Sequence, residues 1–137
     1  MTLEEMLSKE RKQKKKQKHN AEEHRIQCAC VKYFNLKHPK LKGRLFAVPN
    51  GGRRDTVTGG KLKDEGVTAG VSDLILLKSN RDYGALLIEM KTPVGRQSDS
   101  QKEWQKIICE NGEYKYVVCR SLDDFIREVD DYLKNTE

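Results

Sequence analysis

The chain has 137 residues, which is room for one folded domain around one hydrophobic core. Charged side chains make up 35% of the chain and the net charge is +6, so an acidic partner such as a nucleic acid has to be considered first. No stretch approaches the roughly 20 apolar residues of a membrane span, and the first residues lack the apolar run of a signal peptide. The four cysteines lack the paired spacing of a zinc site, so we expect free thiols and a cytoplasmic location.

The positive charge is concentrated in two stretches. Residues 9–18 hold seven basic side chains against one acid, and residues 37–63 hold eight against one. Residues 99–137 instead hold ten acids and six bases. A molecule polarised in this way can dock one face on a phosphate backbone.

Residues 2–36 are predicted to be helical, with a charged first part followed by an apolar helical pattern that includes Ile26, Cys30 and Phe34. Residues 1–20 are expected to be a basic extension, partly helical or disordered, that is a solvated tail or binds nucleic acid without sequence preference. Residues 21–137 are expected to form the folded domain. Cys28 and Cys30 should point in different directions on the helix.

An apolar run at residues 45–48 predicts the first strand, and Pro49 ends it. Residues 50–70 then hold six of the ten glycines and few apolar side chains, which predicts a long loop with one helical turn at residues 61–65. The loop lacks the Gly-Lys-Ser/Thr ending of a nucleotide triphosphate loop. We expect it to contact the backbone of a nucleic acid and to follow the shape of that nucleic acid rather than its sequence, although an ordinary solvated loop is the alternative. Its basic side chains are Arg53, Arg54, Lys61 and Lys63.

Residues 72–78 and 85–91 are rich in Leu and Ile and predict two strands of a hairpin. Ser98 and Gln101 have the spacing of a capping box, which predicts a helix with Trp104, Ile107 and Ile108 on one face. Residues 114–120 predict a fourth strand, and Ser121 is expected to cap a last helix. Its inward side chains should be Phe125, Ile126, Val129 and Leu133, and Cys109 and Cys119 are expected in the core.

The predicted order of elements is therefore helix, three strands, helix, strand, helix (αβββαβα). This order indicates an α/β (α+β) fold in which helices flank a mixed central sheet.

Two acidic side chains are expected to face each other in the hairpin. A short connection at residues 80–82 gives a register in which Asp73 lies opposite Glu89, where like charges repel. Strand alternation puts Lys91 on the same face, and Ile75, Leu77 and Leu87 are expected to continue that face toward the core.

Two interpretations of this cluster are open. A divalent cation between Asp73 and Glu89 would turn the repulsion into attraction, with the backbone carbonyl of Met90 as a third oxygen and Lys91 holding a water or a phosphate. Alternatively, Lys91 neutralises an acid in a surface ion pair without any metal.

The residues around this cluster resemble a known nuclease family. Asp73 followed by Glu89 and Lys91 is similar to the Asp and Glu-x-Lys signature of the PD-(D/E)xK nuclease superfamily. A longer string over about residues 21–133 resembles the virus-type replication-repair nuclease domain, VRR-NUC. Its parts are Gly70-Val71-Ser72-Asp73, Ile88-Glu89-Met90-Lys91-Thr92, Gly95-Arg96, Ser98, Gln101 and Trp104. The resemblance implies a restriction-endonuclease-like fold.

The resemblance also implies a set of catalytic residues. Asp73 and Glu89 would bind Mg²⁺ or Mn²⁺, and Lys91 would orient water or bind phosphate. Gln101 matches a glutamine near the family's site, although its role as a capping partner explains it equally well. Glu23 resembles the glutamate that the first helix contributes and would favour a second ion; Glu22 or a plain surface acid are the alternatives. Ser72 stands where the family commonly has proline, and Arg96 is a further candidate DNA contact.

The activity implied by the resemblance is metal-dependent hydrolysis of phosphodiester bonds in DNA. Family members of this size look like phage or prophage enzymes that act on branched DNA in the manner of Holliday junction resolvases, in repair and recombination, often as homodimers. Two rival functions remain: a non-catalytic DNA-binding module of the same fold, and a restriction-type enzyme that reads sequence. Neither a membrane nor a nucleotide cofactor is expected.

Overall fold

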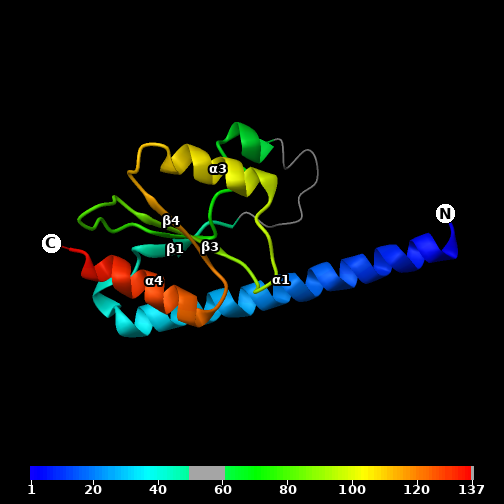
Figure 1. Cartoon of the computed structure of the whole chain (residues 1–137), viewed down its shortest axis with the longest axis horizontal. Coiled ribbons are helices and arrows are strands. Elements are labelled where there is room, and N and C mark those ends of the chain that lie inside the picture. The colour runs from blue at the N-terminus through cyan, green and yellow to red at the C-terminus, as the bar shows by residue number, and fades with distance from the viewer. Residues whose placement is uncertain (50–60, 137) are drawn as a thin grey trace.

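The computed structural model describes residues 1–49 and 61–136. Its first element is one uninterrupted helix, α1 (Leu3–Lys37), which crosses the whole molecule and projects beyond it at the N-terminus (Figure 1). Thr2 begins the helix with a capping box: its hydroxyl accepts from the N–H of Glu5 at 3.2 Å, and the Glu5 carboxylate accepts from the N–H of Thr2 at 3.1 Å. Residues 3–20 are therefore helical, in continuity with the part of α1 that packs on the domain.

Four strands form one mixed sheet in the order β1-β2-β3-β4. The 3-10 helix η1 (Pro39–Leu41) leads from α1 into the sheet, and residues 61–64 form a helical turn before β2. The strands are β1 (Leu45–Ala47), β2 (Leu74–Leu76), β3 (Leu86–Met90) and β4 (Lys115–Cys119). The pairs β1–β2 and β2–β3 are antiparallel, and β3–β4 is parallel. The predicted order of elements and fold class are confirmed.

The predicted register of the hairpin is also correct. Leu74 pairs with Ile88 and Leu76 with Leu86, so the paired numbers add to 162 in each case. The ladder ends earlier than expected, and the connection turns at Asn80, whose side-chain oxygen accepts from the N–H of Tyr83 at 2.8 Å. The same register, extended by one residue, sets Asp73 opposite Glu89 even though the strands are shorter than predicted.

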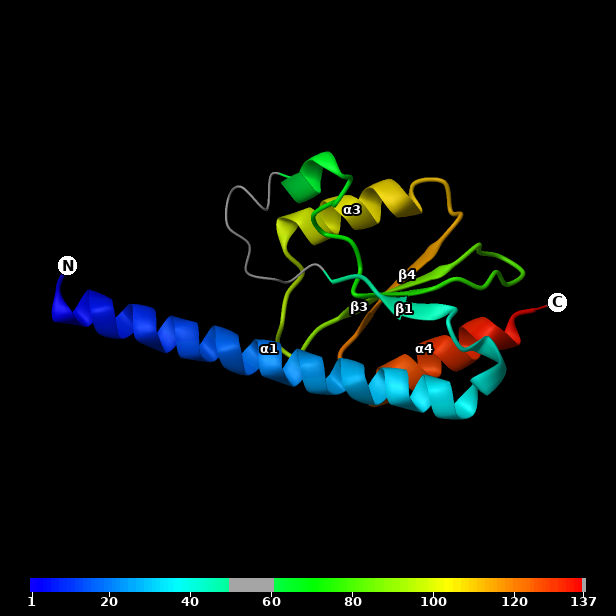
Figure 2. The same ribbon diagram turned by 180° about the vertical axis from the view of Figure 1, so that it is seen from behind.

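Helices cover both faces of the sheet. α1 and α4 (Leu122–Lys134) lie side by side on one face, and α3 (Asp99–Cys109) lies on the other, as opposite views of the molecule agree (Figures 1 and 2). α1 and α4 are also joined by polar contacts, because Asp130 accepts from Lys37 at 3.2 Å and from Tyr33 at 3.3 Å. Because both faces are covered, every residue of β3 is buried.

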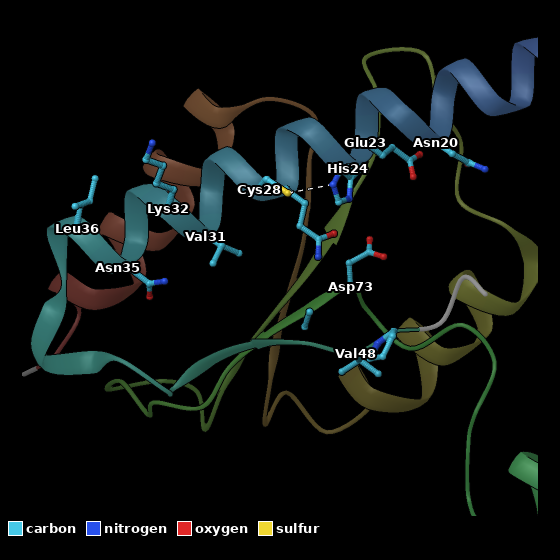
Figure 3. A pocket seen from close by; sticks show the side chains of 13 residues that line it. Asn20, Glu23, His24, Cys28, Val31, Lys32, Asn35, Leu36, Val48 and Asp73 are labelled. Atoms are coloured by element: carbon cyan, nitrogen blue, oxygen red, sulfur yellow. Dashed lines mark hydrogen bonds between the residues drawn. The ribbon is translucent and has the colours of Figure 1, made fainter.

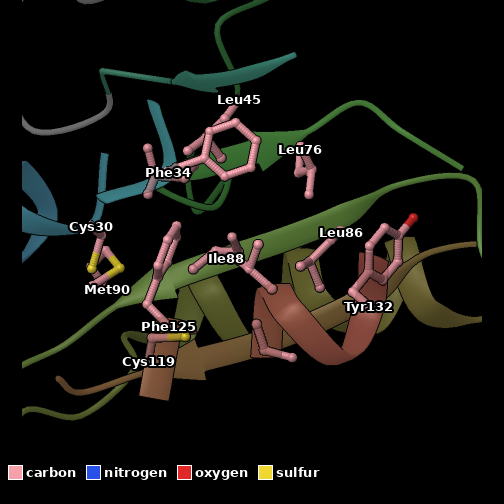
Figure 4. Close-up of a cluster of buried hydrophobic side chains, with 13 residues drawn as sticks. Cys30, Phe34, Leu45, Leu76, Leu86, Ile88, Met90, Cys119, Phe125 and Tyr132 are labelled. Atoms are coloured by element: carbon pink, nitrogen blue, oxygen red, sulfur yellow. The ribbon is translucent and has the colours of Figure 1, made fainter. Parts of the chain in front are cut away.

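The main core lies between the α1–α4 layer and the sheet (Figure 4). Its residues from β2 and β3 are Leu74, Leu76, Leu86, Ile88 and Met90, which alternate with the residues that face α3. The expectation that Ile75, Leu77 and Leu87 point toward the core was therefore wrong for Leu77 and only partly right for Ile75 and Leu87, which are half-buried and buried but lie outside the main cluster. They belong to the α3 face, where α3 covers only part of the sheet: Leu87 is buried, but Leu77 is 53% exposed.

Several helix and cysteine predictions need correction. Ile107 is 61% exposed rather than inward, and Cys109 is only half-buried, because α3 covers the sheet with a narrow stripe near Trp104. α4 buries Phe125 and Val129 as predicted, and also Tyr132, while Ile126 and Leu133 are half-buried.

All four cysteines are free thiols among the described residues. Cys28 is exposed and Cys30 buried, so they do point in different directions. Burial raises the pKa of the Cys30 and Cys119 thiols to about 12. Within the described ranges, no helix has the length and apolar character needed to cross a membrane.

Candidate active site

Asp73 is fixed by contacts on both sides of its strand. Its backbone carbonyl accepts from the N–H of Val48 at 2.9 Å, just after β1. Its carboxylate Oδ2 accepts from the N–H of Met90 at 2.7 Å, at the end of β3. The side chain thus continues the β2–β3 pairing where the backbone ladder stops, and it lies beside Glu89.

Glu89 is the one fully buried acid among the described residues. Gln101 donates to its Oε1 at 3.0 Å, and the hydroxyl of Tyr116 donates to its Oε2 at 3.0 Å. Burial, and then the neighbouring carboxyl group of Asp73, raise the pKa of Glu89 to about 9. Two acidic side chains therefore occupy one small space.

Lys91 supplies a positive charge to the same space. Its Nζ lies 3.9 Å from Oε1 of Glu89, and its side chain is 11% exposed. The ion pair that was considered as an alternative is therefore present, but it is nearly buried rather than at the surface. One lysine faces two acids, so the cluster retains negative charge when both carboxyls are ionised.

Gln101 contacts both the cap of α3 and the buried acid. Its side-chain oxygen accepts from the N–H of Ser98 at 2.8 Å, which completes the capping box of α3. Its side-chain nitrogen donates to Glu89. The cap that begins α3 thus also orients the buried carboxylate.

Glu23 approaches the acid pair from α1. It lines a cleft of about 950 Å³ between α1 and the end of β1, together with Asp73 (Figure 3). Burial raises the pKa of Glu23; the charge of Lys91 lowers it and that of Asp73 raises it. The geometry therefore brings Glu23, rather than Glu22, toward the site.

The donor set can be compared with what a divalent ion needs. Within residues 1–49 and 61–136, no three His, Cys, Asp or Glu side chains lie close enough to form a metal cage by themselves. Mg²⁺, however, is usually held by one or two carboxylates, with waters and substrate phosphates completing its shell. The N–H of Met90 points at Asp73, and in a strand the C=O of a residue projects to the same side as its N–H. Asp73, Glu89 and the Met90 carbonyl therefore fit such an ion.

The other predicted site residues lie in three places. Lys61 and Lys63 are exposed, and Lys63 borders a second cavity of about 490 Å³ that Asp73 and Gln101 also line. Arg96 is exposed on the loop after β3. Arg53 and Arg54 lie outside the described residues.

The sequence did not reveal Tyr116 or His19 as site residues. Tyr116 accepts from Gln97 at 3.1 Å and donates to Glu89, so it links the α3 side of the sheet to the buried acid. His19 Nδ1 lies 3.0 Å from the hydroxyl of buried Thr92, which ties α1 to the loop after Lys91. From the sequence, strand alternation leaves open which face of the sheet Tyr116 lies on. The parallel register of β3 and β4 shows that it lies on the same face as Glu89.

A mixed sheet with an aspartate before one strand, a glutamate and a lysine two apart on the next, and a helix behind them is the arrangement of PD-(D/E)xK nucleases. The family model of the VRR-NUC domain matches residues 9–123. A solved structure described as a VRR_NUC domain protein is 26% identical, with a TM-score of 0.69 over 84% of this chain and 90% of that one. No curated protein matches the chain. The chain belongs to the VRR-NUC family and is a nuclease of the PD-(D/E)xK type.

Proposed function

We propose that this protein is a metal-dependent DNA endonuclease whose reaction centre consists of Asp73, Glu89 and Lys91. The observation that carries the proposal is the fully buried Glu89 carboxylate beside the carboxylate of Asp73. Two acids held together at the cost of mutual repulsion need a compensating positive charge, and Lys91 supplies only one. Residues 21–137 then form the nuclease domain, and residues 1–20 an extension of it.

The chain's own residues have distinct roles in this centre. Asp73, Glu89 and the Met90 carbonyl would hold Mg²⁺ or Mn²⁺, which supplies Lewis-acid chemistry to the scissile phosphate when bound. Gln101 and Tyr116 fix the orientation of the Glu89 carboxylate through their hydrogen bonds. Lys91 stabilises the charge that develops on the phosphate oxygens. Glu23, at the edge of the cleft, is a candidate ligand for a second ion.

The substrate is proposed to be branched DNA, such as a four-way junction, processed by an enzyme of phage or prophage type. The cleft of about 950 Å³ beside Asp73 supports this, because the side-chain amides of Asn20, Gln27 and Asn35 line it and leave room for an unpaired strand. Exposed Lys61, Lys63 and Arg96, together with Arg53 and Arg54, are the proposed contacts to the DNA backbone. Contacts to the backbone recognise the shape of the DNA rather than its base sequence, whereas a restriction-type enzyme recognises a sequence.

Cleavage of labelled duplex, flap and four-way junction DNA tests the proposal. With Mg²⁺ or Mn²⁺ we expect the junction to be cut fastest, chelator to abolish cutting, and Asp73→Ala to lower the rate at least about 1,000-fold because a removed ligand cannot be replaced. Asp131→Ala is the matched control, since Asp131 is an exposed acid of α4 on the far side of the sheet, and its rate should be unchanged.

Two outcomes would contradict this proposal. DNA binding without metal-dependent cutting, unaltered in Glu89→Ala and Lys91→Ala, would indicate a non-catalytic module. Cutting at one sequence motif in any DNA structure would indicate a restriction-type enzyme.

We also propose that the enzyme acts as a homodimer, because a two-fold assembly presents two centres to the two strands of a junction. Sedimentation equilibrium at the protein concentration used for cleavage should give twice the chain mass of 15.8 kDa. A monomer at that concentration, with full junction cleavage, would disprove the dimer.

A further inference from the structure

Three of the seven basic side chains in the first part of α1 lie on the same helix face as Glu23 of the candidate site. We define residues 3–20 as the N-terminal arm, which extends beyond the sheet in both views (Figures 1 and 2). At 100° per residue, Lys9, Lys12 and Lys16 fall within about 40° of the direction of Glu23. Arg11, Lys14 and Lys18 point about 120° to 180° away from it. We call the first three the basic stripe and the other three the opposite set.

One face of α1 thus changes its chemistry along its length. Phe34 and Cys30 are buried in the core at one end, Glu23 borders the cleft, and His19 contacts Thr92. These residues lie on one face of the helix, and the basic stripe continues that face outward. The face that packs the helix on the sheet therefore becomes a row of exposed cations beyond it.

The dimensions of this row match a stretch of DNA. At 1.5 Å per residue, the row begins about 10 Å along the axis from Glu23 and ends about 21 Å from it. A duplex rises 3.4 Å per base pair, so 21 Å corresponds to about six base pairs. The row is straight because it lies on one uninterrupted helix, and a duplex is straight over the same length.

We propose that the basic stripe binds the phosphate backbone of the double-stranded DNA that flanks the scissile phosphate on one side. This inference rests on the proposed function for the location of the scissile phosphate. The contact does not require the metal, because lysine side chains neutralise phosphates directly. It places the duplex arm of the substrate along α1 and gives the centre a fixed direction on the DNA.

Two variants of equal charge test the inference by fluorescence anisotropy with a labelled duplex, in chelator so that no cutting occurs. Lys9→Gln, Lys12→Gln and Lys16→Gln remove the basic stripe together; Arg11→Gln, Lys14→Gln and Lys18→Gln remove the opposite set. Glutamine has nearly the helix propensity of lysine and arginine, and circular dichroism checks that the arm stays helical.

For the stripe variant we expect at least a tenfold loss of affinity at moderate salt. The slope of log K against log salt should become shallower by about 2 to 3, because each lost phosphate contact is worth about 0.9. In the opposite-set variant, the loss of affinity and the change in salt slope should each be less than a third of those in the stripe variant. Equal losses in both variants, or none in either, would overturn the inference, as would an equal effect on single-stranded DNA.

Cleavage distinguishes a failure of this inference from a failure of the proposed function. With an active enzyme, shortening one duplex flank below about six base pairs should slow wild-type cutting but leave the stripe variant unaffected. Insensitivity of both proteins to flank length would disprove the arm contact while leaving the nuclease intact. Stripe-dependent binding without any cutting would disprove the proposed function alone.

Discussion

The carboxyl group of Glu89 lies in a fully buried position between Gln101, Tyr116 and Lys91. Its two hydrogen bonds fix its orientation, but they do not remove the repulsion from Asp73. In the absence of a divalent ion, the ionised pair should therefore oppose folding. Residues that a catalytic site needs often reduce stability in this way.

We predict that Glu89→Gln stabilises the metal-free protein by at least about 1 kcal/mol at pH 8, because the folded wild type must keep a proton on Glu89 that the unfolded state has released, and glutamine needs none. Glutamine keeps the shape of the side chain: its oxygen can accept from Gln101, and its NH₂ group can donate to the hydroxyl of Tyr116. Urea unfolding in chelator measures the difference. A loss of stability in this variant would show that the pair is not repulsive.

The same pair predicts a pH dependence of the metal-free protein. The pKa of Glu89 is raised from 4.5 to about 9, so the folded state keeps a proton that the unfolded state releases between these values. The contribution of Glu89 to the free energy of unfolding should therefore be highest below pH 4.5 and should fall as the pH rises toward 9. The Glu89→Gln variant should show a smaller fall over this window, measured by urea unfolding at each pH; identical profiles would contradict the account.

At the scale of elements, Gly70 controls how the segment before β2 meets the start of α3. Its φ of +84° is in the left-handed region, and a Cβ added there would lie 2.2 Å from the carbonyl oxygen of Ser100. Gly70 is three residues before Asp73, and Ser100 is next to Gln101. The close approach therefore holds Asp73 and Gln101 near each other on the α3 side of the sheet.

We predict that Gly70→Ala costs about 3 kcal/mol of unfolding free energy, of which about 1 to 2 kcal/mol comes from the left-handed backbone and the rest from the contact with Ser100. Gly66→Ala is the matched control, because Gly66 has a φ of +102° but an open surrounding. Its cost should be limited to the backbone contribution. Thermal or urea unfolding compares them, and equal costs would show that the approach to Ser100 is unimportant.

Much of this level of structure could be predicted from local sequence signals. The capping box of Ser98 and Gln101 indicated the start of α3, and the Leu and Ile runs indicated the hairpin and its register. The core face of the hairpin could not be identified in this way. β3 is buried on both faces, so the alternation of apolar and polar side chains that usually marks the core is absent.

At the scale of the whole molecule, the candidate site is formed by segments from across the chain. Asp73, Glu89 and Lys91 come from the hairpin and were predictable from its register. Tyr116 comes from β4, whose parallel pairing depends on the packing of α3 and cannot be inferred from local pattern. The helix over residues 2–36 was predicted, but the order of its first part was not, because that part lacks an apolar face.

The central claim is that Asp73 and Glu89 hold a divalent ion between them, and crystals soaked in Mn²⁺ test it most directly. We predict an anomalous difference peak within about 2.3 Å of an oxygen of each carboxylate. The peak should vanish in Asp73→Asn crystals prepared in the same way. Carboxylates that point apart with no peak between them, in crystals where Mn²⁺ reaches the cleft, would contradict the account.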